Sequence, residues 1–233
     1  MNRIQRIVIV LATLIPMGLS GCAEGPFWKM GAYLPWVQAK WQAEEQIAET
    51  IHAKKKNLRA LASSARSFSN AQKEQAIVQL TQVVQNERIL QLRVEAAHVL
   101  GELDTQSAEV LLQELMKDSD AEVRIAAVKS LAKRRTETAG KELIRVLGSD
   151  TDKDVRSATI RGLANFPGRQ TIQALTIVLD EHEPALQYRA MDTLAQITSE
   201  KIGPSVPKWK EYLAAKGFQS NQIANTELNR AFQ

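Results

Sequence analysis

Four nine-residue stretches decide the fold of this chain, because they can be superimposed on one another without gaps. They are Leu92–Leu100 (LRVEAAHVL), Val123–Leu131 (VRIAAVKSL), Val155–Leu163 (VRSATIRGL) and Leu186–Leu194 (LQYRAMDTL). Their first residues stand 31, 32 and 31 positions apart. The first, fifth, sixth and ninth positions are apolar, apart from Thr159, and these spacings mark one face of an α-helix. The sequence therefore contains four copies of one helical unit.

A second apolar helix precedes each of these stretches. Its residues recur as Leu80 and Val84, Leu111 and Leu115, Leu143 and Leu147, and Leu175 and Leu179. Turn and N-cap residues follow it in the last three copies, at Lys117–Asp120, Gly148–Asp152 and Asp180–Pro184. A hairpin this short cannot bury its own apolar face, so neighbouring copies must stack. We predict an all-α fold, an α-α superhelix of about four helical hairpins over residues 72–200.

Two further helical segments are expected to flank the repeats. Residues 36–71 contain neither Gly nor Pro after Pro35 and carry an apolar stripe of Val37, Trp41, Ile47, Ile51, Leu58 and Leu61. After the repeats, residues 201–215 are expected to form a C-terminal helix that covers the end of the array with Trp209, Tyr212 and Leu213. The polar tail of residues 216–233 is expected to be flexible.

The basic run Lys54–Lys56 with Arg59 lies in the N-terminal helical segment. One interpretation is a contact with anionic lipid headgroups. The other, which we favour, is a solvated helix face, since three lysines make a weak patch.

The N-terminus has the three parts of an export signal. Arg3 and Arg6 are followed by the apolar run Ile7–Leu19, which is shorter than the roughly 20 residues needed to cross a bilayer. The run ends in Leu19-Ser20-Gly21-Cys22, which resembles the lipobox of bacterial lipoproteins. The resemblance implies that residues 1–21 are cleaved and that Cys22 carries covalent lipid. An ordinary secreted protein and an uncleaved anchor are the alternatives.

Lipid on Cys22 has consequences for anchoring and location. Cys22 is the sole cysteine, so it has no internal disulfide partner, and two or three acyl chains would hold the protein on a membrane. The protein is then expected to face the periplasm or the exterior. Ala23 rather than Asp follows the cysteine, which by the family's sorting rule implies the outer membrane where the envelope is double.

Residues 22–35 are interpreted as a lipidated tether, because Gly25, Pro26, Gly31 and Pro35 punctuate them. Their aromatic residues are Phe27, Trp28 and Tyr33. These rings are suited either to the membrane interface or to docking on the first helices, and their spacing does not decide between the two.

Composition narrows the class of partner. The chain is 44% apolar and 24% charged, with 5% aromatic residues, which favours a helical globular protein. Its formal charge is +4, and loss of Arg3 and Arg6 with the signal lowers it to about +2. Such a charge gives no reason to expect a nucleic-acid partner.

The repeat period and the pattern Val-Arg-x-x-Ala-x-x-x-Leu resemble HEAT-like repeats, particularly the short bacterial form. In that family the arginine at the second position commonly bonds acidic turn residues of a neighbouring repeat. The resemblance therefore implies a ladder from Arg93, Arg124 and Arg156 to such partners as Asp120 and Asp152. Gln187 replaces the arginine in the last copy, which indicates that the stack ends there.

A search for catalytic and metal-binding patterns finds none in the sequence. His52, His98 and His182 belong to three separate elements, with no His-x-x-x-His or Glu-x-x-His spacing. No Gly-x-Ser-x-Gly elbow or glycine-rich phosphate loop is present, and lipid on Cys22 would exclude thiol catalysis. The recurring Asp118/Asp120 and Asp150/Asp152 pairs are interpreted as turn and capping residues. We expect no enzyme activity, no metal and no cofactor beyond the lipid.

The remaining feature is a surface. In stacked hairpins the second helices line the concave side, so positions four, seven and eight of each stretch are predicted to form a groove. The residues selected from it are Glu95, His98, Lys129, Arg161, Arg189 and Asp192. Mixed charge and small residues suit an extended or helical protein partner better than a phosphate polymer. An undedicated solvated face is the alternative.

These observations lead to three functional hypotheses. The first is a membrane-anchored, non-enzymatic scaffold that binds a protein partner in the cell envelope. The second is a passive spacer or accessory subunit of an envelope complex. The third is enzymatic, since short bacterial HEAT-like repeats resemble those of phycobilin lyases, although an export signal argues against that chemistry.

Overall fold

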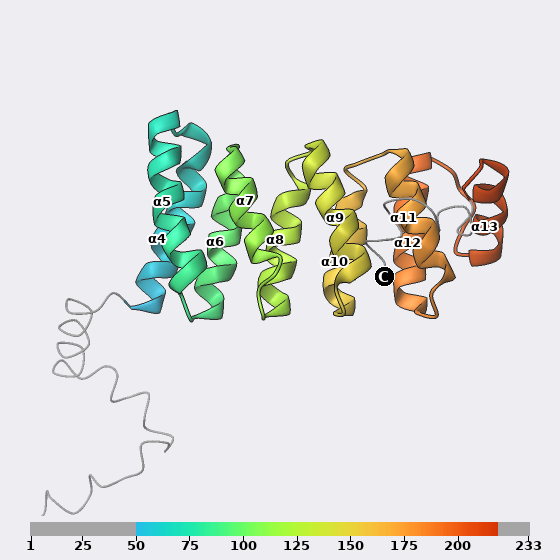
Figure 1. Cartoon of the computed structure of the whole chain (residues 1–233), viewed down its shortest axis with the longest axis horizontal. Coiled ribbons are helices and arrows are strands. Elements are labelled where there is room, and N and C mark those ends of the chain that lie inside the picture. The colour runs from blue at the N-terminus through green and yellow to red at the C-terminus, as the bar shows by residue number, and fades with distance from the viewer. Residues whose placement is uncertain (1–49, 219–233) are drawn as a thin grey trace, which may run out of the picture. The chain divides into compact units, whose positions relative to one another are not determined.

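The computed structural model describes residues 50–218, in which every regular element is helical. Figure 1 shows the helices standing side by side in chain order. They are α4 (Ile51–Ser64), the 3-10 helix η1 (Ala65–Ser67), α5 (Asn70–Asn86), α6 (Leu90–Glu102), α7 (Gln106–Leu115), α8 (Ala121–Ala132), α9 (Glu137–Ser149), α10 (Lys153–Leu163), α11 (Arg169–Asp180), α12 (Pro184–Thr198) and α13 (Val206–Ala215). The expected cleavage site, Cys22, the tether, residues 36–49 and the tail beyond residue 218 lie outside this description.

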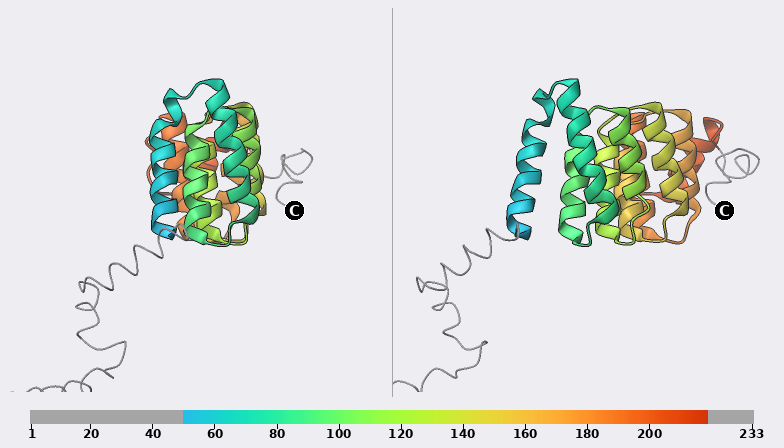
Figure 2. Two further views of the ribbon diagram at one scale, coloured as in Figure 1. Left: turned by 90° about the vertical axis from the view of Figure 1, so that its left-hand side faces the viewer. Right: turned by 60° about the vertical axis from the view of Figure 1, so that its left-hand side comes forward.

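The predicted α-α superhelix of four hairpins is confirmed. The hairpins are α5–α6, α7–α8, α9–α10 and α11–α12, and each nine-residue stretch lies in the second helix of its hairpin. Second helices pack on second helices, in the order α6, α8, α10 and α12, while α5, α7, α9 and α11 form the other layer. The end view in Figure 2 shows these two layers. The second helices pack more closely against one another than the first helices do, as expected for an inner layer.

Side-chain caps explain where several helices begin. Ser69 and Gln72 form a reciprocal capping box at the start of α5. Thr105, Thr136 and Asp152 each accept a bond from a backbone N–H in the first turn of α7, α9 and α10. Each cap satisfies a donor that has no partner within its helix, which stabilises the protein by about 1 kcal/mol. The hairpin boundaries therefore follow from local residues, and the stacking follows from burial.

One continuous core runs through the array. Leu80, Leu112, Leu143 and Leu175 from the first helices meet Leu100, Leu131, Leu163 and Leu194 from the second helices, and all eight are fully buried. Burial of each leucine contributes about 1.5–3 kcal/mol. Because the four units share this core, they are expected to support one another rather than fold singly.

Two glycines set the close approach of the second helices. A Cβ atom at Gly101 would lie 2.8 Å from Cβ of Ser130, and one at Gly162 would lie 2.9 Å from Cβ of Ala132. Either distance is a steric overlap, so α6 can approach α8, and α8 can approach α10, only with glycine there. The small residues of the second helices thus serve packing between helices.

Each end of the array has its own covering helix. At one end α4 packs on α6, with Leu58 and Leu61 half-buried against the core. At the other end α13 packs on α11 and α12 and buries Trp209 and Leu213. The predicted capping helix at the C-terminal end is therefore confirmed. Among residues 50–218 no helix is both long enough and apolar enough to span a membrane.

Candidate protein-interaction surface

The seventh positions of the four stretches form a row of exposed side chains across the second helices. These residues are His98 on α6, Lys129 on α8, Arg161 on α10 and Asp192 on α12. Since adjacent second helices pack side by side, the four residues follow one another across the layer. We call this row the second-helix ridge.

Positions four and eight differ from the predicted groove. Ala126 and Ala158 at position four are buried, as are Val99, Ser130 and Thr193 at position eight. These side chains lie between neighbouring second helices, where close packing requires small residues. The prediction that positions four and eight line an open groove is wrong for these five residues, because neighbouring second helices cover the face on which they lie.

The two charged residues predicted at position four of the groove, Glu95 and Arg189, both lie close to opposite charges. Glu95 is 8% exposed, and its carboxylate accepts a hydrogen bond from Nε of Arg59 at 2.9 Å. Lys55 lies 3.4 Å from the same carboxylate. Arg189 is half-buried on α12, with Nη1 3.8 Å from a carboxylate oxygen of Asp192. Glu95 is thus covered and neutralised by α4, and Arg189 partly neutralises Asp192.

The basic run of α4 makes ion pairs within the array. Lys54 lies 3.7 Å from Glu87, and Lys55 and Arg59 share Glu95. The favoured interpretation of a purely solvated face is wrong in part, because these cations pair with carboxylates of the first hairpin. The ion pairs connect α4 to the first hairpin, and sequence reasoning missed them because the partners are more than 30 residues apart.

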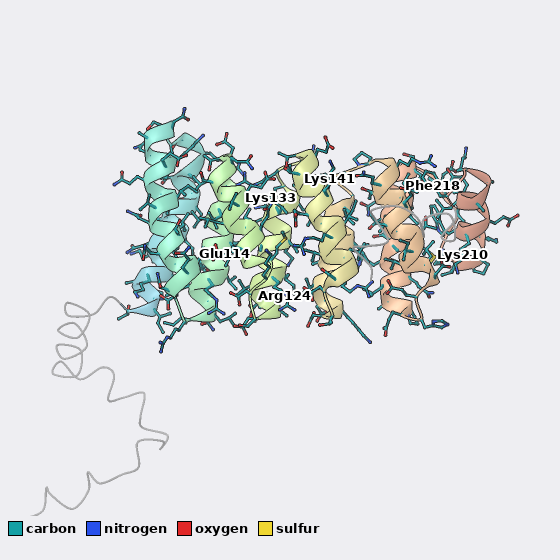
Figure 3. The ribbon with its side chains drawn as sticks, in the orientation of Figure 1. Glu114, Arg124, Lys133, Lys141, Lys210 and Phe218 are labelled. Carbon is teal, nitrogen blue, oxygen red and sulfur yellow. The ribbon has the colours of Figure 1, made fainter. Side chains whose placement is uncertain are left out.

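A second shared carboxylate lies at the C-terminal end of α6. Glu102 pairs with Arg66 at 2.7 Å and with Lys133 at 2.9 Å. The hydrogen bond from Lys133 is the largest cause of the lowered pKa of Glu102, and the bond from Arg66 adds to it. Arg124 and Lys133 lie near opposite ends of α8 (Figure 3). The polar contacts between repeats therefore occur at both ends of the second helices.

The predicted arginine ladder is present at the turn end. Arg93 donates from Nε and Nη2 to both oxygens of Asp118, at 2.8 and 3.0 Å, and from Nη2 to Asp120 at 2.6 Å. Its Nη1 donates to the carbonyl oxygens of Glu87 and Arg88 in its own turn. The hydrogen bond to Asp118 is the largest cause of the raised pKa of Arg93. This arginine therefore joins two consecutive hairpins.

The other ladder partners differ in part from the expected ones. Arg124 makes a two-pronged contact with Asp150, at 2.8 and 3.1 Å, and Arg156 bonds Glu181. The expected partner Asp152 is wrong, because its carboxylate instead caps α10 through the N–H groups of Asp154 and Val155. The acceptor in this turn stands two residues before the cap.

Gln187 keeps only half of the arginine's contacts. Its Nε2 donates to the carbonyl oxygens of Leu179 at 3.1 Å and Glu181 at 2.6 Å. These two bonds hold its own turn, and within residues 50–218 its side chain bonds no residue further along the chain. The helix that follows α12 is the α13 cap rather than another hairpin. The interpretation that the stack ends here agrees with this geometry.

His98 reports on the charge around the ridge. Partial burial is the largest cause of its lowered pKa, while Glu95 opposes the shift. Lys133, Lys129 and Arg59 each lower the pKa further, since a cation disfavours protonation of a nearby imidazole. Cations of α4 and α8 and the residue after α8 are therefore close enough to His98 of α6 to lower its pKa.

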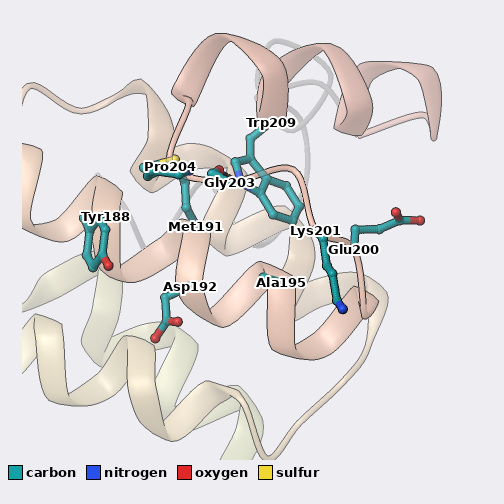
Figure 4. Close-up of a pocket in the computed structure, with 9 residues that line it drawn as sticks. All are labelled: Tyr188, Met191, Asp192, Ala195, Glu200, Lys201, Gly203, Pro204 and Trp209. Carbon is teal, nitrogen blue, oxygen red and sulfur yellow. Dashed lines mark hydrogen bonds between the residues drawn. The ribbon is translucent and has the colours of Figure 1, made fainter.

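A cavity of about 330 Å³ lies beside the C-terminal cap. Figure 4 shows it between α12, which provides Tyr188, Met191, Asp192 and Ala195, and the segment that leads to Trp209 of α13. Its acidic groups already have neighbours: Arg189 lies near Asp192, and Tyr212 donates to Glu200 at 3.2 Å. The cavity brings together no nucleophile and base, so it does not form a recognisable catalytic site.

No group of three or more His, Cys, Asp or Glu residues within positions 50–218 is arranged to hold a metal ion. His52, His98 and His182 belong to α4, α6 and the turn before α12. The acidic pairs in the turns bond arginines and backbone N–H groups instead. Among the described residues, the second-helix ridge is therefore the feature most suited to binding another molecule.

A match to one protein family supports the repeat architecture. A family model described as HEAT repeats matches residues 77–164 and 140–213. The crystal structure of an engineered protein is similar at 18% sequence identity, covering 80% of this chain and 90% of that protein, with a TM-score of 0.44. No curated protein matches this chain in sequence.

Proposed function

This chain belongs to the HEAT-repeat family, whose model matches more than half of its residues, and we propose that it is a non-enzymatic scaffold for protein–protein interaction. The observation that carries the proposal is the second-helix ridge, an exposed row of side chains on a layer that glycine contacts hold in close packing. A rigid array of this kind offers a partner a preformed surface, which lowers the entropy lost on binding.

The proposal includes a membrane anchor. The lipobox-like sequence before Cys22 is its support: a lipid on this cysteine would place the array at the surface of a bacterial membrane, facing the periplasm or the exterior. Mass spectrometry of the N-terminal peptide tests this directly. The expected peptide begins at Cys22 with added acyl mass, and a Cys22→Ser variant should lose that mass. A mature chain with an unmodified thiol would contradict the anchor.

Site-specific photo-cross-linking tests the scaffold role. A benzoylphenylalanine placed at Lys129 on α8 should give a discrete adduct with a protein partner in the cell envelope. The matched position is Val110 on α7, which is 53% exposed but belongs to the first-helix layer. Adducts at Lys129 and not at Val110 are expected. Absence of adducts at both positions in envelope preparations would argue for a passive spacer.

A further inference from the structure

Positive charge is in excess on α4 and η1 and on the part of the second-helix ridge that α6, α8 and α10 form beside them. Glu95 is shared by Lys55 and Arg59, and Glu102 is shared by Arg66 and Lys133. The side chain of Glu95 is 11% exposed and that of Glu102 is 18% exposed, whereas Arg59 and Arg66 are 64% and 81% exposed. In both clusters, the one around Glu95 and the one around Glu102, the positive side chains are therefore more exposed to solvent than the negative one.

Two further cations continue this charge along the ridge. Lys129 and Arg161 are exposed, and no carboxylate of residues 50–218 makes an ion pair with either. Both lie in the last turn of their helices. Lys129 occupies the same position of its stretch as His98 does on the neighbouring helix. The ridge thus presents unneutralised charge on successive helices. We call Arg59, Arg66, Lys129, Lys133 and Arg161 the basic track.

Acidic residues of the same helices lie away from the track. Glu122 on α8 and Asp154 on α10 each precede the ridge residue of their helix by seven positions. At 1.5 Å per residue this is about 10 Å along the helix axis. Asp192 on α12 ends the positive stretch. The track is therefore bounded at one side and at one end by negative charge.

We infer that the basic track binds an acidic, extended segment of a protein partner, an inference that rests on the proposed scaffold function. Packed helices stand about 8–10 Å apart, and a peptide in the extended polyproline II conformation advances about 3.1 Å per residue with three residues per turn, so that every third side chain lies on the same side. Three residues of such a peptide therefore match one step between second helices. A segment with an acidic residue at every third position would place one carboxylate beside each successive helix.

Fluorescence anisotropy with designed peptides tests this inference on the purified full chain. One labelled peptide of twelve residues carries glutamate at every third position, and the other has the same composition with its glutamates contiguous. The spaced peptide is expected to bind more tightly. The Lys129→Glu/Arg161→Glu variant should weaken its binding by about tenfold or more, and added salt should weaken it in the wild type.

The matched control is Lys201→Glu/Lys208→Glu, which changes net charge equally near the C-terminal cap. Both lysines are exposed, and within residues 50–218 neither has an ion-pair partner. This variant should bind like the wild type. Circular dichroism should show unchanged helicity for both variants. If the charge reversal lowers helicity, Lys129→Gln/Arg161→Gln replaces it, and this neutral variant should weaken peptide binding to an intermediate extent.

The outcomes separate this inference from the scaffold proposal. Equal binding of the spaced peptide by the wild type and by the Lys129→Glu/Arg161→Glu variant would overturn the inference. Tighter binding of a single-stranded oligonucleotide or of vesicles with anionic lipid would overturn the choice of an acidic protein. If the adduct formed by benzoylphenylalanine at Lys129 persists when Arg161→Glu is added, the scaffold stands and the acidic segment falls. If peptide binding holds but no envelope partner is found, the scaffold proposal fails instead.

Discussion

Arg93 shows how a single side chain joins two repeats. Its guanidinium contacts two carboxylates of the following turn and two carbonyl oxygens of its own turn. The planar fork of arginine suits this arrangement, since it presents donors in several fixed directions at once. Asp118 lies in the turn of the second hairpin, so the contact aligns the first hairpin on the second.

Arg93→Ala is expected to lower the free energy of unfolding by about 2–4 kcal/mol. Breaking a buried ion pair costs about 3–5 kcal/mol, and the half-exposed Asp120 reduces that cost here. Urea denaturation followed by circular dichroism measures the change. Arg93→Lys keeps the charge but not the planar fork, so its free energy of unfolding should lie between those of the wild type and Arg93→Ala. A loss below about 0.5 kcal/mol, typical of surface substitutions, would show that the contact contributes little.

The same pair predicts a dependence of stability on pH. Burial raises the pKa of Asp118, but its bonds with Arg93 and the backbone N–H of Asp120 outweigh this, so the net pKa is lowered. A carboxylate with a lowered folded pKa stabilises the protein above its unfolded pKa, near 3.9 for Asp, and loses that contribution as the pH falls through the folded value. Stability should therefore decline below about pH 4.

Comparison of Arg93→Ala with the wild type isolates this effect. Without the arginine, burial should raise the pKa of Asp118. Protonation at low pH should then remove the cost of burying an unpaired carboxylate in the variant. The difference in unfolding free energy between the two proteins should therefore shrink between about pH 7 and pH 3. Urea titrations at several pH values provide the measurement. A difference that stays constant over this range would mean that Asp118 is not the partner responsible.

Prediction from sequence reached the ladder arginines but not all of their partners. The repeat pattern marks Arg93, Arg124 and Arg156 because each occupies the second position of its stretch. Asp150 and Asp152 are both turn carboxylates, and only the three-dimensional turn decides which one bonds an arginine and which one caps α10. To choose between them, the first residue of α10 must be known to within one position, and sequence patterns do not define helix ends that accurately.

At the scale of the helix, the distance between neighbouring second helices depends on glycine and other small residues at their contacts. Gly162→Ala is expected to destabilise the protein by about 1–3 kcal/mol, because the new methyl group would overlap with Ala132 on the neighbouring helix. The higher helix propensity of alanine, about 1 kcal/mol, opposes this loss only in part. Thermal and urea unfolding measure the net change.

The reciprocal variant Gly162→Ala/Ala132→Gly tests the cause. It moves the methyl group to the other side of the same contact, so it should recover most of the stability lost by Gly162→Ala alone. If the losses from the two single substitutions simply add, the overlap between α8 and α10 does not limit the approach of the helices.

Helix faces explain why the site was only partly predicted. An apolar period locates the buried face of each second helix, but it does not show that a neighbouring second helix also covers positions four and eight. Glu95 illustrates this: a charged residue suggests solvent, yet α4 supplies Arg59 and covers it. His98, Lys129, Arg161 and Asp192, at the seventh position, lie on the open face as expected.

At the scale of the molecule, an array of this kind gains stability mainly through contacts between neighbours. Each hairpin packs mainly on the units beside it, so the ends are expected to open before the middle. The C-terminal end depends on Trp209, which is 1% exposed and donates from Nε1 to the carbonyl oxygen of Gly203 at 2.9 Å. Its ring also meets Tyr212 edge to face, with centroids 5.8 Å apart.

Trp209→Ala is therefore expected to remove the cap without unfolding the array. The substitution should cost about 3–5 kcal/mol locally. Hydrogen exchange should show faster exchange in α11, α12 and α13, while α6 and α8 keep nearly wild-type protection, because they share no direct contact with the cap. Trp209→Phe, which retains an aromatic ring but not the indole N–H, should have a smaller effect. Equal loss of protection from α5 to α13 would instead require one cooperative unit, and the nearest-neighbour description of this array would then be wrong.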